Sequence, residues 1–156
     1  MKNYALIDGN TLHLGIKQLN WKVDYKKFRV YLRDKYSVVK AYYFIGYIGE
    51  NERLYNYLIS SGYTMVYKPV VQDATGVLKG NCDAELVLQA MIDLNNYDQA
   101  VIVSSDGDFT CLADYLQQSK KLRAVMAPHQ DTTSVLLKKK IRSMVFMDHL
   151  KNKSGK

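Results

Sequence analysis

The chain has 156 residues, 47% of them hydrophobic, which is enough for one good core and short for two. It carries 22 Lys and Arg against 15 Asp and Glu, a formal net charge of +7, and only two cysteines, too few for a disulfide-stapled secreted scaffold. No apolar run approaches a membrane span of roughly 18 residues and the N-terminus lacks a signal-peptide core, so a cytoplasmic protein that does not enter the membrane is predicted.

The charge is unevenly distributed along the chain. Residues 1–60 carry ten basic and five acidic groups, residues 61–110 carry two and seven, and residues 111–156 carry ten and three. A basic surface around an acidic pocket suits a polyanion whose phosphates meet lysines while metal ions neutralise the carboxylates. Nucleic acid is therefore the predicted partner, although a net charge of this size also serves solubility alone.

The first half of the chain alternates strand and helix patterns. A buried strand at 4–7 ends in Asp-Gly, and Asp24 is a suitable N-cap for an amphipathic helix that includes Phe28, Tyr31 and Leu32. The further predicted elements are a strand at 38–47, a helix at 50–60 that Gly62 stops, a strand at 63–67, and a connecting loop or small hairpin at 69–80.

The second half continues the alternation. Asn81 can cap a helix that runs to about residue 95, and residues 100–103 are the most strand-like run of the chain. After these we predict a helix at 109–118, a strand at 122–126, a short helix at 132–140 with a basic end, an edge strand at 143–147, and a disordered basic tail at 151–156.

This alternation predicts an α/β fold with a parallel sheet and right-handed crossovers. We expect a three-layer sandwich around a central, mostly parallel sheet of about five or six strands. Residues 1–150 are predicted to form a single domain.

Three acidic motifs lie where a strand pattern gives way to a helix pattern. They contain Asp8, then Asp83, then Asp106 and Asp108. Strand-to-helix turns meet at the carboxyl edge of a parallel sheet, and neighbouring strands there are about 4.8 Å apart. Clustered carboxylates without His or Cys ligands suit a hard cation, so the four aspartates are the predicted catalytic and metal-binding residues for Mg²⁺ or Mn²⁺.

Each motif also has a purely structural interpretation. Asp8 can be a turn residue in Asp-Gly-Asn, Asp108 can cap the following helix, and Asp83 can complement a helix dipole. All three explanations would have to coincide at one edge of one sheet, which favours a shared site.

Polar residues beside these aspartates are candidates for substrate binding. Lys79 can hold a phosphate or remain a solvated loop lysine, and Asn10 and Ser105 can bind a phosphate, a metal-bound water or the local turns. The histidines do not converge in spacing. The 13 tyrosines fit base stacking, but amphipathic packing or a self-association surface explains most of them better, which leaves a homo-oligomer open.

At these motifs the chain resembles the NYN domain family, in particular its LabA-like branch within the PIN-like group of metal-dependent ribonucleases. The resemblance runs from about Tyr4 to Leu150 and rests on Ile-Asp-Gly-Asn at 7–10, Lys-Gly-Asn-Cys-Asp at 79–83 and Ser-Ser-Asp-Gly-Asp-Phe at 104–109. It implies a parallel sheet between helices and places the metal-site role on the four aspartates. Many members read Asp-Gly-x-Asn at the first motif, whereas here the fourth position is Thr11, a hydroxyl in place of an amide.

The resemblance implies a metal-dependent ribonuclease. We predict that its RNA partner is single-stranded. A non-catalytic RNA-binding or regulatory module that retains the acidic pocket is the alternative. A phosphatase acting on a small molecule is a third reading, but the chain has Asp-Gly-Asn-Thr-Leu at 8–12 in place of the Asp-x-Asp-x-Thr nucleophile pattern.

Overall fold

The structure is a computed structural model that describes residues 1–16 and 21–155, without the side chains of residues 13–16, 78, 79 and 152. Its strands are β1 (Asn3–Asp8), β2 (Val38–Tyr47), β3 (Tyr63–Pro69), β4 (Val71–Gln72), β5 (Leu78–Lys79), β6 (Ala100–Val103), β7 (Leu122–Ala127) and β8 (Met144–Phe146). Its helices are α1 (Gly9–Ile16), α2 (Tyr25–Tyr36), α3 (Glu52–Ser60), α4 (Asp83–Ile92), α5 (Thr110–Gln118), α6 (Val135–Lys140) and α7 (Lys151–Ser154). Short 3-10 helices η1 (Gly49–Asn51), η2 (Gly107–Phe109) and η3 (Met147–His149) precede α3, α5 and α7.

Six strands form the central sheet in the order β3-β2-β1-β6-β7-β8, and every neighbouring pair in it is parallel. The predicted α/β class and parallel sheet are therefore confirmed. Strands β4 and β5 pair antiparallel as a separate hairpin, which is the second of the two forms predicted for residues 69–80.

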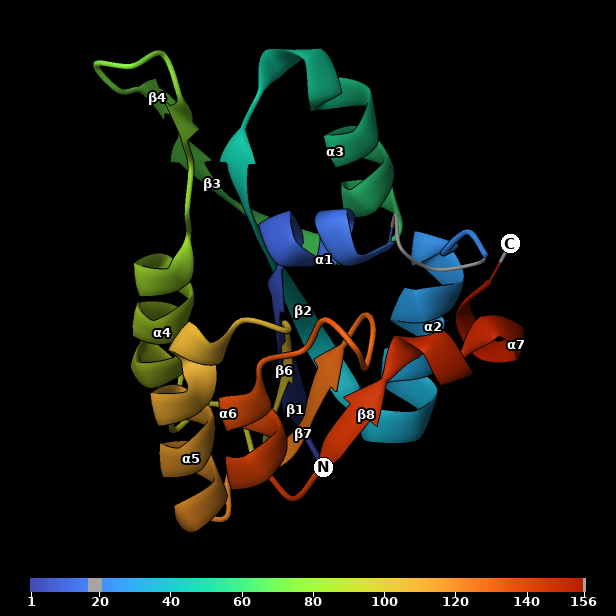
Figure 1. The fold of residues 1–156 in the computed structure, drawn as a ribbon. Helices are drawn as coiled ribbons and strands as arrows, with labels where there is room; N and C mark the ends of the chain where they lie inside the picture. The colour runs from blue at the N-terminus through green and yellow to red at the C-terminus, as the bar shows by residue number, and fades with distance from the viewer. Residues whose placement is uncertain (17–20, 156) are drawn as a thin grey trace.

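Alternation along the strands divides the core between the two faces of the sheet. In β1, Ala5 and Ile7 pack with residues of α1, α2 and α3, whereas Leu6 packs with residues of α4, α5 and α6. Figure 1 shows these two helical layers on opposite sides of the sheet. Because successive side chains of a strand point to opposite faces, a strand buried on both sides is apolar throughout.

Helix α2 forms where the pattern predicts it. Asp24 Oδ1 accepts hydrogen bonds from the backbone N–H groups of Lys26 and Lys27, and Phe28 and Leu32 are fully buried. The helix ends at Ser37, whose left-handed φ of 55° lets its N–H return to the last turn.

Helix α1 has no counterpart among the predicted helices. It begins directly after Asp8, where the sequence indicates a turn. The predicted turn at residues 8–10 therefore coincides with the start of α1.

Residues 151–155, which belong to the segment predicted to be a disordered tail, contact the start of α2 in the structure. Ser154 O accepts a hydrogen bond of 2.7 Å from Asp24 N, Gly155 forms a β-bridge with Val23, and Ser154 is fully buried. The tail is held through its backbone, which a polar side-chain pattern does not reveal.

The order of the strands creates one topological switch point. From β1 the chain moves outward through β2 to β3, and then crosses back to β6 and outward through β7 to β8. The crevice at the carboxyl ends of β1 and β6 is where such sheets bind ligands.

Candidate metal centre

Asp8 and Ser104 lie side by side at this switch point. Ile7 of β1 is in register with Val103 of β6, so the next residue of each strand leaves the sheet at the same level. Ser104 Oγ donates a hydrogen bond of 3.1 Å to Asp8 Oδ2, and both side chains are buried. The two motifs that are far apart in sequence are thus joined directly.

Asp83 reaches the same place from the start of α4. Asn10 Nδ2 donates a 2.9 Å hydrogen bond to Gly80 O, which ties the loop before α4 to the first motif. Asn81 Oδ1 accepts a 2.7 Å hydrogen bond from Asp83 N, the capping contact that the sequence predicts, although the helix itself starts one residue later than Asn81 would place it.

Asp8, Asp83 and Asp106 form a cluster, called here the three-carboxylate cluster. One oxygen of each lies within 4.8 Å of the others. Oxygens that bind one Mg²⁺ at 2.0–2.1 Å are roughly 3 to 4 Å apart, so small side-chain rotations bring this set onto one ion or its water shell. None of the three forms a salt bridge with a described Lys or Arg side chain. The donor set therefore fits a hard divalent cation.

Burial and mutual repulsion disfavour the negative charges of this cluster. The pKa of Asp83 is raised to about 6, first by burial and then by the charges of Asp106 and Asp8. Burial also raises the pKa of Asp8, against hydrogen bonds from Thr11 and Ser104 that lower it. A bound cation or a proton is needed to relieve this charge.

Asp108 does not belong to the three-carboxylate cluster. It is exposed in the first turn of η2, and its N–H donates a 2.9 Å hydrogen bond to Asp106 Oδ1. Its charge contributes to the raised pKa of Asp83. Its backbone thus orients Asp106, and its carboxylate lies at the rim of the site.

Thr11 and Ser104, which flank the first and third motifs and are not among the predicted site residues, contact Asp8 directly in the structure. Thr11 Oγ1 donates a 2.8 Å hydrogen bond to Asp8 Oδ2, and its backbone N–H lies 3.4 Å from Asp8 Oδ1. Ser104 Oγ also accepts a 3.0 Å hydrogen bond from Asp106 N. The spacing Asp-x-x-Thr before a helix is an N-cap signal that indicates the Thr11 contact, whereas the Ser104 contacts depend on the strand order.

The structure gives hydrogen bonds for two of the predicted substrate-binding residues, Asn10 and Ser105, and only the backbone position of the third, Lys79. The Asn10 amide is bonded to Gly80 O, and Ser105 O accepts a hydrogen bond of 3.1 Å from Ser134 N. The backbone of Lys79 lies in β5, whereas its side chain is outside the described residues.

Lys68 and Cys82 flank the cluster without entering it. Lys68 Nζ forms a 2.9 Å salt bridge with Glu85 and donates a 2.9 Å hydrogen bond to Asn81 O, so a positive charge stands beside the start of α4. Burial raises the pKa of the Cys82 thiol to about 11, and the thiol lies 3.4 Å from Gly80 O. A thiol that stays protonated does not favour a soft metal here.

The NYN domain family model matches residues 4–148. The chain belongs to the NYN domain family. The match covers all three acidic motifs and ends close to residue 150, the predicted limit of the resemblance.

Two relatives place the chain within this family and fold. The low amplitude and bright protein LabA of Synechococcus elongatus is 27% identical over 113 residues, which cover 66% of this chain and 61% of LabA, so this NYN domain protein is LabA-like. The chain thus spans less than two thirds of that relative. A crystal structure of a protein of unknown function from Vibrio parahaemolyticus superposes with a TM-score of 0.78 at 23% identity, covering 94% of this chain and 92% of that one, which shows a shared fold.

NYN domains have a PIN-like nuclease fold and generally act on RNA, and this member retains a three-aspartate cluster at its switch point. In the described part of the chain, none of the helices has the length and hydropathy of a membrane span.

Proposed function

We propose that this NYN domain protein hydrolyses RNA phosphodiester bonds with Mg²⁺ or Mn²⁺. The supporting observation is that Asp8, Asp83 and Asp106 come from three different elements and converge at the switch point of the sheet. Two of these carboxyl groups have raised pKa values and none has a described cationic partner, so holding a divalent ion is the chemistry to which the site is suited.

The residues of the site have separable roles in this proposal. Asp8, Asp83 and Asp106 would hold the ion, and Thr11 and Ser104 orient Asp8. A divalent ion bound there supplies the charge that activates a water and stabilises negative charge on the phosphate. The water oxygen would bond to phosphorus while a carboxylate takes the proton that the water loses. The bond to the leaving sugar oxygen would break, and this oxygen would keep the bonding electrons and take a proton from solvent.

Asp83 and Asp108 are the candidate acceptors of the proton that the attacking water loses. The pKa of about 6 at Asp83 applies to the metal-free site, so its role as a proton acceptor is proposed from its place in the cluster and not from that value. Asp108 is exposed at the rim of the site and would act through a water molecule between it and the ion. Asn10, Lys79 and Ser105 are proposed to position a single-stranded substrate, and residues 1–150 to form one domain.

The test replaces Asp106 by Asn, which preserves shape and removes charge. Cleavage of a labelled single-stranded RNA in Mn²⁺ should fall roughly 100-fold or more, because a metal ligand is lost. Asp98→Asn is the matched control, since Asp98 is exposed at the amino edge of the sheet, where its Oδ2 accepts a hydrogen bond from Lys2 N. Cleavage by Asp106→Asn at the wild-type rate, with a normal circular dichroism spectrum, would overturn the proposal.

The alternative is an RNA-binding or regulatory module without turnover. Thr11 in place of the more common Asn is the observation that favours it, because the first motif departs from the pattern of many members. Binding measured beside cleavage separates the two: RNA retained on a filter, with no products at any Mg²⁺ or Mn²⁺ concentration, would support the module.

A further inference from the structure

A second feature lies on the helical layer that does not carry Asp83. A groove of about 710 Å³ runs between α2 and the C-terminal segment His149–Lys153. From α2 it is lined by Lys26, Lys27, Val30, Tyr31, Asp34 and Lys35. These residues recur at the spacing of one helix face, so the groove follows the axis of α2.

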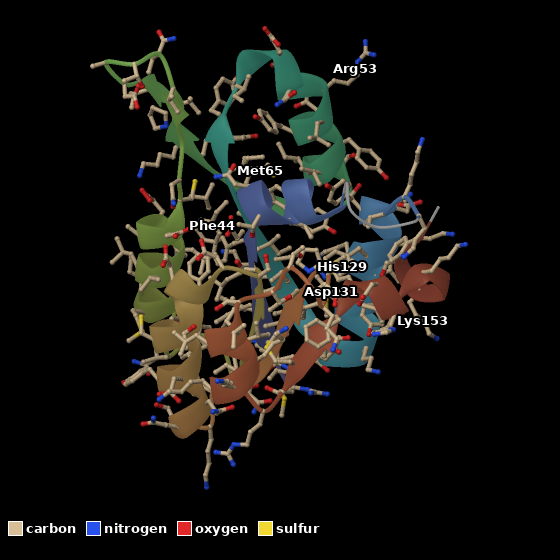
Figure 2. The ribbon with its side chains drawn as sticks, in the orientation of Figure 1. Phe44, Arg53, Met65, His129, Asp131 and Lys153 are labelled. Carbon is tan, nitrogen blue, oxygen red and sulfur yellow. The ribbon has the colours of Figure 1, made fainter. Side chains whose placement is uncertain are left out.

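The groove combines a cationic rim with an apolar floor. Lys26, Lys35 and Lys153 are exposed at its rim, and none forms a salt bridge with a carboxylate of the described residues. Figure 2 shows Lys153 on α7, beside α2. The acidic lining residue Asp34 is engaged by Arg33 at 2.9 Å. The lining thus carries four lysines against one aspartate, and no described carboxylate lies within 4.0 Å of the ammonium groups of Lys26, Lys35 and Lys153.

The floor of the groove is formed by Val30, Tyr31 and Leu150. The His149 imidazole stands exposed across from α2, and its Nε2 lies 3.7 Å from Asp148 Oδ1. An apolar floor with ring edges between lysines suits bases and sugars better than it suits an isolated inorganic ion.

The direction of α2 links the groove to the three-carboxylate cluster. Asn3 at the start of β1 bonds to Tyr36 O and Ser37 O, so the C-terminal end of α2 lies at the amino edge of the sheet. Lys26 at the other end therefore lies toward the carboxyl edge, where Asp8 is. From Lys26 to Lys35 the helix rises about 13 Å. The groove thus leads away from the cluster along the outside of the molecule.

We propose that this groove is a second RNA-binding site, which holds the phosphate backbone of the strand flanking the bond at the three-carboxylate cluster. The proposal rests on the proposed function for the identity of the polyanion as RNA. Lys26, Lys35 and Lys153 contact phosphates, and the apolar floor receives a base. Such contacts add affinity without reading sequence.

The experiment compares two triple variants with the same loss of charge. Lys26→Gln/Lys35→Gln/Lys153→Gln removes the rim lysines, and Lys138→Gln/Lys139→Gln/Lys140→Gln removes exposed lysines from the end of α6, on the other layer. Binding of a long fluorescent oligouridine is measured by anisotropy in EDTA. The groove variant should bind roughly tenfold more weakly at low salt, with the slope of log K against log salt reduced by about 2 for three lost contacts.

The Lys138→Gln/Lys139→Gln/Lys140→Gln variant should bind the oligouridine less than about twofold more weakly than the wild type. Equal losses in the two variants would mean that affinity follows net charge, and no loss in the groove variant would mean that the groove is not used; either result overturns the proposal. Thermal unfolding of both variants confirms that they remain folded.

Cleavage kinetics keep this proposal separate from the proposed function. The groove variant should show a raised KM for long RNA with kcat unchanged, because the groove does not touch the reacting bond. If the wild-type protein binds RNA without cleaving it, the proposed function fails while the EDTA binding comparison still decides the groove. A fall in kcat with unchanged affinity would contradict the groove assignment.

Discussion

Thr11 stands where many members of the family have Asn in the first acidic motif, and its side chain makes a direct contact with Asp8. Its hydroxyl donates to Asp8 Oδ2 at 2.8 Å and lies 3.2 Å from Ser104 Oγ. Asp8 is therefore held by two hydroxyl groups that also contact each other. A buried carboxylate held in this way is both oriented for a metal and partly compensated without one.

Replacing Thr11 by Val tests this role. The variant keeps the branched shape but removes the donor, so Asp8 retains one hydroxyl partner and its pKa rises further. We expect Mn²⁺ affinity, measured by calorimetry, to fall roughly tenfold, the lower range for the loss of a residue that orients a ligand. Thr11→Ser keeps the hydroxyl and should bind Mn²⁺ as the wild type does; identical affinities of the Val and Ser variants would contradict the role.

The raised pKa values predict how stability depends on pH without metal. Asp83 has a folded pKa of about 6 against an ordinary value of 3.8, so its protonation stabilises the fold. This contribution is fully present below about pH 4 and is lost as the pH rises through about 6. Asp93 has the opposite effect on stability. Burial raises its pKa, but hydrogen bonds from Tyr42, Gln89 and Asn96 lower it more, so the net pKa lies below the ordinary value. Its stabilising contribution is therefore present above the ordinary pKa of Asp and is lost as the pH falls through the lowered value.

Thermal unfolding at pH 5 and pH 7.5 measures this dependence. The metal-free protein should lose stability between these values, and Mn²⁺ should raise the melting temperature more at pH 7.5, where protons compete less for the carboxylates. Asp83→Asn is the control, and its melting temperature should change less between the two pH values. A variant with the full wild-type pH dependence would show that other groups cause it.

At the scale of elements, apolar patterns predicted the sheet and most helices, because the four inner strands β1, β2, β6 and β7 are largely buried and α2, α3, α4 and α5 each have buried apolar residues. Helix α1 was not predicted, since Gly9 and Gly15 interrupt any helical pattern. Close packing explains why residue 9 is a glycine although glycine disfavours helix formation. A Cβ at Gly9 would lie 2.5 Å from Tyr43 Cε1 and 2.6 Å from Phe44 O. The glycine is required because α1 passes directly over β2.

Gly9→Ala should therefore destabilise the protein. The new Cβ meets a buried ring and a backbone carbonyl that cannot both move away, and such overpacking costs about 1 to 3 kcal/mol. Gly49→Ala is the matched control, because no atom lies within 4 Å of a Cβ there and the change should cost less than about 0.5 kcal/mol. Urea unfolding of both variants measures the difference. Equal midpoints would show that α1 can shift away from β2.

The candidate site was predictable to the extent that it depends on motif spacing. Asp8, Asp83 and Asp106 each follow a strand or begin a helix, and the structure brings one oxygen of each together. Asp108 stays apart because it follows Asp106 by two residues in η2, where its N–H bonds to Asp106 Oδ1. The contact of Ser104 with Asp8 needed the position of β6 beside β1, which pattern alone does not give. The catalytic roles remain predictions.

At the scale of the whole molecule, the acidic and basic segments of the sequence contribute to two different sites. The acidic middle segment supplies Asp83 and Asp106 to the switch point, whereas the two basic flanks meet in the groove between α2 and α7. This meeting depends on α7 packing against α2, on the layer opposite α4. Segments from both ends of the chain thus build the cationic surface together.

The tail that was predicted to be disordered provides the last test. Its attachment consists of the Asp24 N to Ser154 O hydrogen bond and the bridge from Gly155 to Val23. A Cβ at Gly155 would lie 3.3 Å from the Trp21 ring, so the tail packs against the single tryptophan of the chain, which is half-buried.

A chain that ends after Leu150 should lose these contacts and expose Trp21. We expect a red shift of tryptophan emission and a loss of about 1 to 3 kcal/mol in unfolding free energy, since backbone hydrogen bonds and apolar cover are removed together. Ser154→Ala is the control, because Ser154 Oγ is buried and has no hydrogen-bond partner among the described residues, so its removal should be neutral or slightly stabilising. Wild-type emission and stability in the shortened chain would mean that the tail is not docked in solution, and the groove would then lack its wall at Lys153.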